Sequence, residues 1–250
     1  MSSANTTLSI GGVNWEGWES VEVSQQVDAA AGTFSLGLAD KWRVEQMAPA
    51  LAAGRACEVT ASGDTLISGY IDKLNISFSP GAHGITVSGR DKTGDLVDCS
   101  AVHEPGFFKN QTVQQLASTL AGPFSISVSA DADPGEPIEV FKIEEGETAF
   151  MAIDRAARMR GLLAVPDGRG GLSLGRPGQA RSSPALVQGL NVKEGNVGYD
   201  FGDRHSDYIC KGQKRGTDDD YGESCCGVKG EGQDAGIDRY RPLIVRPESQ

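Results

Sequence analysis

Residues 84–100 read GITVSGRDKTGDLVDCS. The opening ITVS alternates apolar and polar side chains, which is typical of a β-strand with one buried face. The strand ends in a charged run and passes at once into a short helical turn, DLVD. This order predicts a strand of a β-barrel that hands the chain over to a separate domain. We therefore expect four charged residues to lie at a domain or subunit junction: Arg90, Asp91, Lys92 and Asp95.

Upstream of this stretch, residues 1–92 are predicted to be β structure. VEVSQQV and FSLGL alternate on either side of a turn, and CEVTA and LISGYIDKLNISFS form a second predicted hairpin about Gly63–Asp64. In the longer strand the apolar residues change from odd to even positions, which predicts a β-bulge near Asp72–Lys73. Closed sheets need such bends, so we expect a first β-barrel here.

Downstream, residues 93–183 carry helical periodicity and are predicted to form a small α/β domain. Apolar residues recur at i, i+3, i+4 and i+7 from Val113 to Leu120, which indicates one face of a helix. Thr112 and Gln115 have the spacing of a capping box, and Gly122 is a suitable stop.

A second helix is predicted over roughly residues 148–160, ended by Gly161. Its apolar face is expected to be Phe150, Ile153 and Ala157. Its solvated face is expected to be Arg155, Arg158 and Arg160. Three acidic residues precede the helix, and their negative charges are favourable near the positive end of the helix dipole: Glu144, Glu145 and Glu147. The turn DGRGG then predicts a hairpin between LLAV and LSL.

The polar, Pro-containing segment RPGQARSSP (176–184) predicts a linker, after which β character returns. An internal echo appears here at an offset of 174 residues, since Val23 maps to Val197 and Phe34 to Tyr208. The echo is what a duplicated hairpin would leave, and we expect a second barrel over residues 184–250. Much of this region is polar and Gly-rich, so we expect that barrel to be short of strands and incomplete at its C-terminal end. Either the chain is truncated or a neighbouring molecule completes the sheet.

The composition is that of an ordinary globular protein, with 23% charged and 38% hydrophobic residues. A net charge of −11 argues against nucleic acid as a bound partner, because phosphate contacts require lysine and arginine. No stretch approaches the roughly 20 apolar residues of a membrane span. The five cysteines lack metal spacing. Cys57 alternates within a strand and is expected in the core, while the adjacent Cys225–Cys226 leave open a redox or metal pair or free thiols in an exposed loop.

The sequence offers no convincing catalytic constellation, so no enzyme activity, cofactor or metal is expected. The histidines, His83, His103 and His205, share no metal spacing and are expected at the surface or half-buried. DDDYGE (218–223) leaves a calcium site open, but it lacks the EF-hand spacing.

Three segments resemble the baseplate hub proteins of Mu-like contractile phages, which are related in fold to the hub of T-even phages. They are ISGYIDKLNISFSPGAHGITVSGRDKTGDLVDCSAV, and GNVGYDFGDRHSDYICKGQ with RYRPLIV. The resemblance implies a fold that is mainly β, with two similar β-barrels flanking an inserted α/β domain. Members usually continue past the RPLIV strand, a departure that puts closure of the second barrel in doubt.

The same resemblance implies a homotrimer whose six barrels form a ring with pseudo-sixfold symmetry. The implied partners are other copies of the chain, the tail tube protein and the central spike protein. The implied location is the virion tail baseplate, after assembly in the host cytoplasm.

Within the middle region, FKIEEGETAFMAIDRAARMRGLL resembles the LysM pattern of a strand, Gly-Glu-Thr and an amphipathic helix. LysM units bind the sugar backbone of peptidoglycan. The alternative function is therefore a peptidoglycan-binding or cell-wall-degrading tail component that acts through this LysM-like domain. The same segment also fits a purely structural βα module.

Overall fold

The computed structural model divides the chain into two compact units, Met1–Gly178 and Gln179–Gln250. It describes residues 5–27, 29–39, 51–79, 82–178, 187–192, 194–212, 222, 225 and 227–246. Most of the predicted linker and of the DDDYGE segment, together with Cys226, lies outside the described residues.

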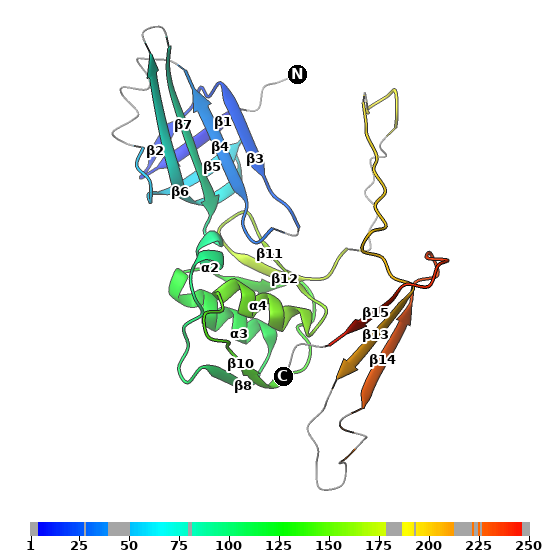
Figure 1. The fold of residues 1–250 in the computed structure, drawn as a ribbon. Coiled ribbons are helices and arrows are strands. Elements are labelled where there is room, and N and C mark those ends of the chain that lie inside the picture. Colours follow the sequence, from blue (N-terminus) through cyan, green and yellow to red (C-terminus); the bar gives the residue numbers. More distant parts are fainter. Residues whose placement is uncertain are drawn as a thin grey trace. The chain divides into compact units, whose positions relative to one another are not determined.

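The first part of the chain forms a curled seven-stranded antiparallel sheet (Figure 1). Its strands are β1 (Thr6–Ile10), β2 (Val13–Trp15), β3 (Ser20–Ser24), β4 (Thr33–Leu38), β5 (Ala56–Ala61), β6 (Asp64–Ser79) and β7 (Ala82–Asp91). The strand order is β2-β1-β5-β6-β7-β4-β3, so β2 and β3 are the two edges among the described residues. The predicted β character is confirmed for this region.

Two local predictions concern the hairpin turn and the bulge of this sheet. The β5–β6 hairpin exists, but its turn lies one residue earlier than predicted, at Ser62 and Gly63, whose φ values are 53° and 91°. Two successive residues with positive φ match the right-handed twist of a hairpin. The pairing of β6 with β7 shifts register between Ile71 and Lys73, which confirms the predicted bulge.

The sheet encloses an apolar core because the inward residues of its strands alternate with outward polar ones. The buried set comprises Leu8, Ile10, Phe34, Leu36, Leu38, Leu51, Cys57, Val59, Ile67, Ile71, Ile85 and Val87. Cys57 is 7% exposed, as predicted for a core thiol.

Residues 94–175 form the helical part of the same unit. Its elements are α2 (Gly94–Asp98), β8 (Phe107–Gln111), α3 (Val113–Ala121), the 3-10 turn η1 (Gly122–Phe124), β9 (Val128–Ala130), β10 (Ile138–Lys142), α4 (Ala149–Arg158), β11 (Leu163–Pro166) and β12 (Leu172–Gly175). β10 pairs with β8, and β11, β12 and β9 form a three-stranded sheet in that order. The predicted α/β character of this region is confirmed.

Local sequence signals explain the ends of both long helices. Thr112 caps α3, and Thr112 and Gln115 exchange the two hydrogen bonds of a capping box. Helix α3 ends at Gly122, but the chain continues as a 3-10 turn and takes the left-handed conformation only at Ser125. Helix α4 ends at Arg158, and Gly161, whose φ is 63°, takes the left-handed conformation shortly after it.

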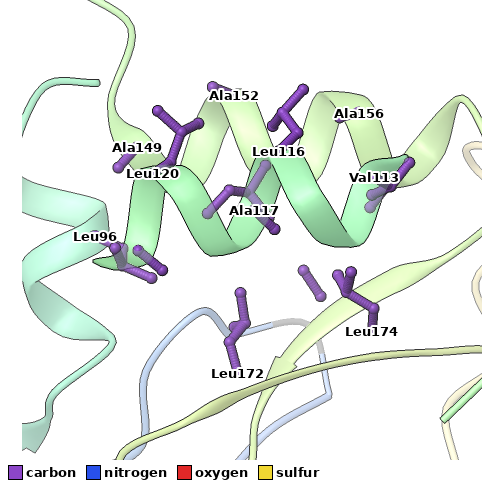
Figure 2. Close-up of a cluster of buried hydrophobic side chains, with 14 of the residues drawn as sticks. Leu96, Val113, Leu116, Ala117, Leu120, Ala149, Ala152, Ala156, Leu172 and Leu174 are labelled. Atoms are coloured by element: carbon purple, nitrogen blue, oxygen red, sulfur yellow. The ribbon is translucent and has the colours of Figure 1, made fainter. Parts of the chain in front are cut away.

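The two long helices share one core with the sheets beside them. Figure 2 shows Leu116, Ala117 and Leu120 of α3 beside the alanines of α4, above Leu172 and Leu174 of β12. Small alanine side chains on α4 allow the helices to approach closely. The other α4 face differs from the prediction, since the Arg155 side chain is only 12% exposed. The prediction that Arg155 is solvated is therefore wrong.

The second unit contains a three-stranded sheet in the order β14-β13-β15. Its strands are β13 (Asp207–Gly212), β14 (Val228–Gln233) and β15 (Pro242–Val245). Strand β13 lies 174 residues after β4 and has the same length. The echoed residues differ in environment, however: Phe34 is buried, whereas its counterpart Tyr208 is half-buried. Residues 194–198, which correspond to β3 at this offset, form no strand.

Candidate junction site around Arg90 and Asp98

The site begins at the bulge in β6, opposite the end of β7. The register shift between Ile71 and Lys73 leaves Asp72 without a Cα partner on β7. A bulge re-aims the extra side chain away from the regular alternation of the strand. The Asp72 carboxylate accepts a hydrogen bond from Arg90 Nε, at 2.7 Å.

The same arginine reaches into the helical region. Arg90 Nη1 donates to Asp98 Oδ1 at 3.2 Å, and Nη2 donates to Asp98 Oδ2 at 2.6 Å. Asp98 is the last residue of α2, so the arginine connects both long strands of the sheet to this helix. Hydrogen bonds from Arg90 hold the pKa of Asp98 below its usual value, and the hydrogen bonds that Arg90 donates to Asp98 and Asp72 raise its own pKa.

Asp91 shapes the turn between the sheet and α2. It is 2% exposed, and its Oδ1 accepts hydrogen bonds from the Thr93 backbone N–H, at 2.7 Å, and from the Thr93 hydroxyl. Burial raises the pKa of Asp91, although the hydrogen bonds from Thr93 act in the opposite direction. This aspartate therefore fixes the backbone locally instead of pairing with a cation.

Lys92 and Asp95 lie on either side of this turn. The Lys92 N–H donates to Ser68 O at 3.1 Å, and the Lys92 side chain lies against Gly170 in the β11–β12 turn. Asp95 is half-buried in the first turn of α2. Burial raises the pKa of Asp95, and the charge of Arg90 offsets part of that rise. Of the four predicted residues, Arg90 makes the ion pairs and Asp91 contacts Thr93 within the same turn. Lys92 contacts β6 and the β11–β12 turn, and Asp95 lies in the first turn of α2.

Two glycines allow the paired strands β6 and β7 to lie very close together beside the site. A Cβ on Gly69 would lie 1.9 Å from Arg90 O, and a Cβ on Gly89 would lie 2.0 Å from Tyr70 O. Neither position can hold a side chain without moving backbone atoms. The backbone that carries Arg90 therefore depends on glycine on both strands.

The arginine's partners, Asp72 and Asp98, were not among the predicted site residues. The change of parity near residue 72 was a signal for Asp72, because a bulged residue leaves the regular alternation. Asp98 had a weaker signal, in that a carboxylate ending a short helix lies within reach of a cation just before that helix.

A second charged contact lies before α4, where the buried Glu147 meets Arg155. Arg155 Nε and Nη2 donate to the two Glu147 carboxylate oxygens at 2.9 Å each. The guanidinium also stacks over the Phe141 ring, 4.2 Å from its centroid. Partial burial raises the pKa of Glu147, but the hydrogen bonds from Arg155 and the Glu144 N–H, with the Arg155 charge, outweigh it and lower that pKa. This contact explains why Arg155 is not solvated.

The remaining candidates are distributed through the fold. All three histidines are half-buried, and His103 stacks on Phe108 with 4.1 Å between ring centroids. Within the described residues, no group of three or more His, Cys, Asp or Glu side chains is placed to hold a metal ion. Cys225 is 5% exposed, which contradicts an exposed loop at that position. No helix in the described part of the chain is long and apolar enough to cross a bilayer.

The arrangement around Arg90 is suited to holding elements in register. A guanidinium bound by two carboxylates fixes orientation through directional hydrogen bonds. Its side chain and that of Asp72 are each 33% exposed, and that of Asp98 is 52% exposed, so solvent screens part of the attraction.

Two family models match the first unit, with a boundary at the junction. Residues 5–91 match the family described as Mu phage baseplate assembly protein GpP-like, N-terminal. Residues 93–176 match the family described as baseplate hub protein gp44-like, second domain. The chain is 33% identical to the baseplate hub protein gp44 of Escherichia phage Mu, over 99% of this chain. It spans 66% of the length of that curated relative.

Solved structures of phage tail proteins are also similar. A 43 kDa tail protein of prophage MuSo2 from Shewanella oneidensis is 33% identical, with a TM-score of 0.82 over 97% of this chain and 71% of that one. A tail protein from Neisseria meningitidis is 25% identical, with a TM-score of 0.79 over the same shares of the two chains.

Proposed function

Because this chain belongs to the family of baseplate hub proteins of Mu-like phages, we propose that it is a structural hub in the baseplate of a contractile phage tail. It assembles as a homotrimeric ring with pseudo-sixfold symmetry. The ring joins the tail tube protein on one side to the central spike protein on the other. The role is one of shape and contact instead of catalysis, as the descriptions of the relatives suggest.

The observation that carries this proposal is the poor burial of the second unit's sheet. Every residue of β14 is exposed, and Ile244 and Val245 of β15 are 58% and 41% exposed. A sheet that buries so little apolar surface gains little stability by itself. Exposed apolar surface of this kind marks sites of protein contact. The correspondence of β13 to β4 supports a second barrel-like unit, whose sheet is completed when the chains assemble.

The location follows from the role. A hub of this kind is a component of the virion tail baseplate and assembles in the host cytoplasm before the tail is complete. The net charge of −11 supports a protein that does not bind nucleic acid.

The solution mass tests the assembly. Sedimentation equilibrium of the full chain is expected to give three times the 26.3 kDa of one chain. Ile244→Asp places a charge on the exposed sheet and is expected to shift the protein toward monomer, because a contact of this kind does not tolerate an unpaired charge. The matched control Val140→Asp, at a position 39% exposed on β10, should leave the mass unchanged. A monomer at high concentration would contradict the proposal.

The alternative, a peptidoglycan-binding tail component, has one supporting observation. Strand β10, a turn at Gly146 with φ of 84°, and helix α4 follow one another in the order of the LysM pattern. A pull-down with insoluble peptidoglycan tests it. Retention that Met151→Asp abolishes, at a position 57% exposed on α4, would favour this function. The absence of retention would leave only the structural module.

A further inference from the structure

Asp91 occupies an inward position at the end of β7, in line with the core residues Ile85 and Val87. The residue is 2% exposed, and aspartates are almost never buried to this degree without a charged partner. Its direct neighbour on β6 is Gly69, which brings no side chain to hydrogen-bond with it. The end of the first core therefore holds an acidic group at a position that a strand ordinarily gives to an apolar one.

The two oxygens of the Asp91 carboxyl differ in their surroundings. Oδ1 accepts hydrogen bonds from the Thr93 N–H, at 2.7 Å, and from the Thr93 hydroxyl. Oδ2 is buried and has no hydrogen-bond partner among the described residues. Buried polar atoms in folded proteins almost always have a partner, and a buried charge without one is costly. A proton on Oδ2 would remove that charge.

The β11–β12 turn, residues 167–171, packs against the sheet beside this carboxyl. Gly170 of the turn is buried, and a Cβ built on it would lie 3.1 Å from Ser68 O. Ser68 O also accepts from the N–H of Lys92, the residue that follows Asp91, at 3.1 Å. The turn and β7 therefore share a contact on β6 immediately next to the buried acid.

The same turn adds a second carboxylate, whose charge acts on Asp91. Asp167 is exposed, and its Oδ1 accepts from the N–H groups of Arg169 and Gly171. Burial raises the pKa of Asp91 more than the hydrogen bonds from Thr93 lower it, and the charge of Asp167 raises it further. An ionised Asp91 therefore sets two negative charges against each other across the contact.

The cations near Asp91 do not offset this repulsion, since Asp91 forms no ion pair within the described residues. Arg90, the preceding residue, is bound to two other aspartates. The Lys92 side chain lies against the turn, and Arg169 is exposed. Asp95, on α2, has its own pKa lowered by the charge of Arg90 and raised by burial, and it adds no positive charge.

We propose that Asp91 is a proton-dependent latch between the first sheet and the β11–β12 turn. With a proton on Oδ2, the carboxyl is neutral and the turn closes over it. When the proton is lost, the buried charge and its repulsion from Asp167 loosen the turn, so that water reaches the carboxyl. The latch lies within one chain and does not depend on trimer assembly.

The direction of the pH dependence follows from the raised pKa of Asp91. Opening returns the carboxyl to water and to the usual aspartate pKa of 3.8. The stability that the latch adds is therefore fully present below that pH and is lost as the pH rises through the raised pKa. Each unit by which the pKa is raised changes the opening equilibrium about ten-fold. The lowered pKa of Glu147 acts in the opposite direction, so the test compares variants that all keep Glu147.

Nuclear magnetic resonance of the full chain, ¹³C-labelled at aspartate carboxyl carbons, reports the protonation of Asp91. Titrations between about pH 3 and pH 8 of the unaltered chain and of Asp91→Asn assign the signal by its loss. We expect a midpoint clearly above 3.8. A midpoint at or below 3.8 would overturn the proposal, because it would show that a water molecule or a cation satisfies Oδ2 in place of a proton.

Hydrogen exchange of residues 92–98 and 167–171, read by mass spectrometry, tests the latch itself. Asp91→Asn keeps an oxygen for the Thr93 donors and places a neutral amide at Oδ2, so it imitates the protonated form. Near pH 7 it should protect both segments more than the unaltered chain does, by about ten-fold for each unit of the measured pKa rise. The two proteins should converge in acid. Equal protection near pH 7, or weaker protection in Asp91→Asn, would contradict the latch.

Two further substitutions separate the latch from a merely structural role. Asp167→Asn keeps the acceptor for the turn but removes the charge, so it should lower the Asp91 midpoint and reduce the pH dependence of exchange without abolishing it. Asp64→Asn, at an exposed aspartate on β6, is the matched control and should change neither. If Asp91→Asn does not fold, Asp167→Asn decides, and exchange with the pH dependence of the unaltered chain would overturn the proposal.

Discussion

Arg90 and Asp98 meet through two hydrogen bonds, 3.2 Å from Nη1 to Oδ1 and 2.6 Å from Nη2 to Oδ2. One residue ends β7 of the first sheet, and the other ends α2, the first helix of the region that follows. A two-point contact of this kind fixes the direction of the helix as well as its distance. The charged end of β7 therefore has a structural cause.

Arg90→Ala should loosen this connection. We expect a loss of about 1 kcal/mol in the free energy of unfolding, because the groups are partly exposed. The measurement is urea denaturation combined with hydrogen exchange of residues 94–98, which should become faster. Arg158→Ala is the matched control, since Arg158 pairs with Asp154 on an exposed helix face and should cost only about 0.3–0.5 kcal/mol. Equal effects of the two substitutions would contradict this role of Arg90.

Gly89→Ala should be among the most damaging single-methyl changes in the first sheet. The added Cβ would lie 2.0 Å from Tyr70 O and 2.8 Å from the Phe34 ring. We expect a loss of about 3 kcal/mol or more, measured by thermal or chemical denaturation. Gly122→Ala is the control, because Gly122 has helical φ and ψ and open space for a Cβ. A Gly89→Ala protein as stable as the control would show that β6 and β7 do not lie so close together.

The buried Glu147–Arg155 pair predicts a pH dependence of stability. The folded-state pKa of Glu147 lies below the usual glutamate value of 4.5, so the pair stabilises the fold above that pH. This contribution is lost as the pH falls through the lowered pKa. Glu147→Gln should cost on the order of 2 kcal/mol near pH 7, since the pair is largely buried. Denaturation curves between pH 3 and pH 7 should show the two proteins converging at low pH, and a constant difference would count against this pair.

Cys57 should be chemically inert while the sheet is folded. Burial, and then the charge of Asp72, raise the pKa of its thiol to about 12, and the residue is 7% exposed. Only thiolates react readily with alkylating agents. Mass spectrometry after iodoacetamide treatment near pH 8 should find Cys99, which is exposed, modified before Cys57. Early modification of Cys57 in native protein would mean that this part of the sheet opens easily.

Local patterns predicted much of the first unit. Alternation along β4 and the parity change at residue 72 identified the sheet and its bulge, because both arise from neighbouring residues along one strand. The capping box at Thr112 and the stop at Gly161 are likewise local. Arg155 was assigned to the wrong environment because its partner Glu147 lies eight residues away, beyond the range of helical periodicity.

The second unit shows where sequence patterns fail. The apolar alternation of β13 resembles that of β4, but this pattern does not reveal which part of the protein, or of a partner, packs against the apolar face. Arg90 was predicted at a junction from its place at the end of a strand, whereas Asp98 gave only a weak signal, its place at the end of the short helix that follows.

The most direct test of the proposed hub is electron microscopy of the purified full chain, with class averages viewed along the axis of the assembly. We expect rings of three copies in which six similar lobes surround an open centre. Single chains, dimers or open filaments at every protein concentration would contradict a ring-forming hub.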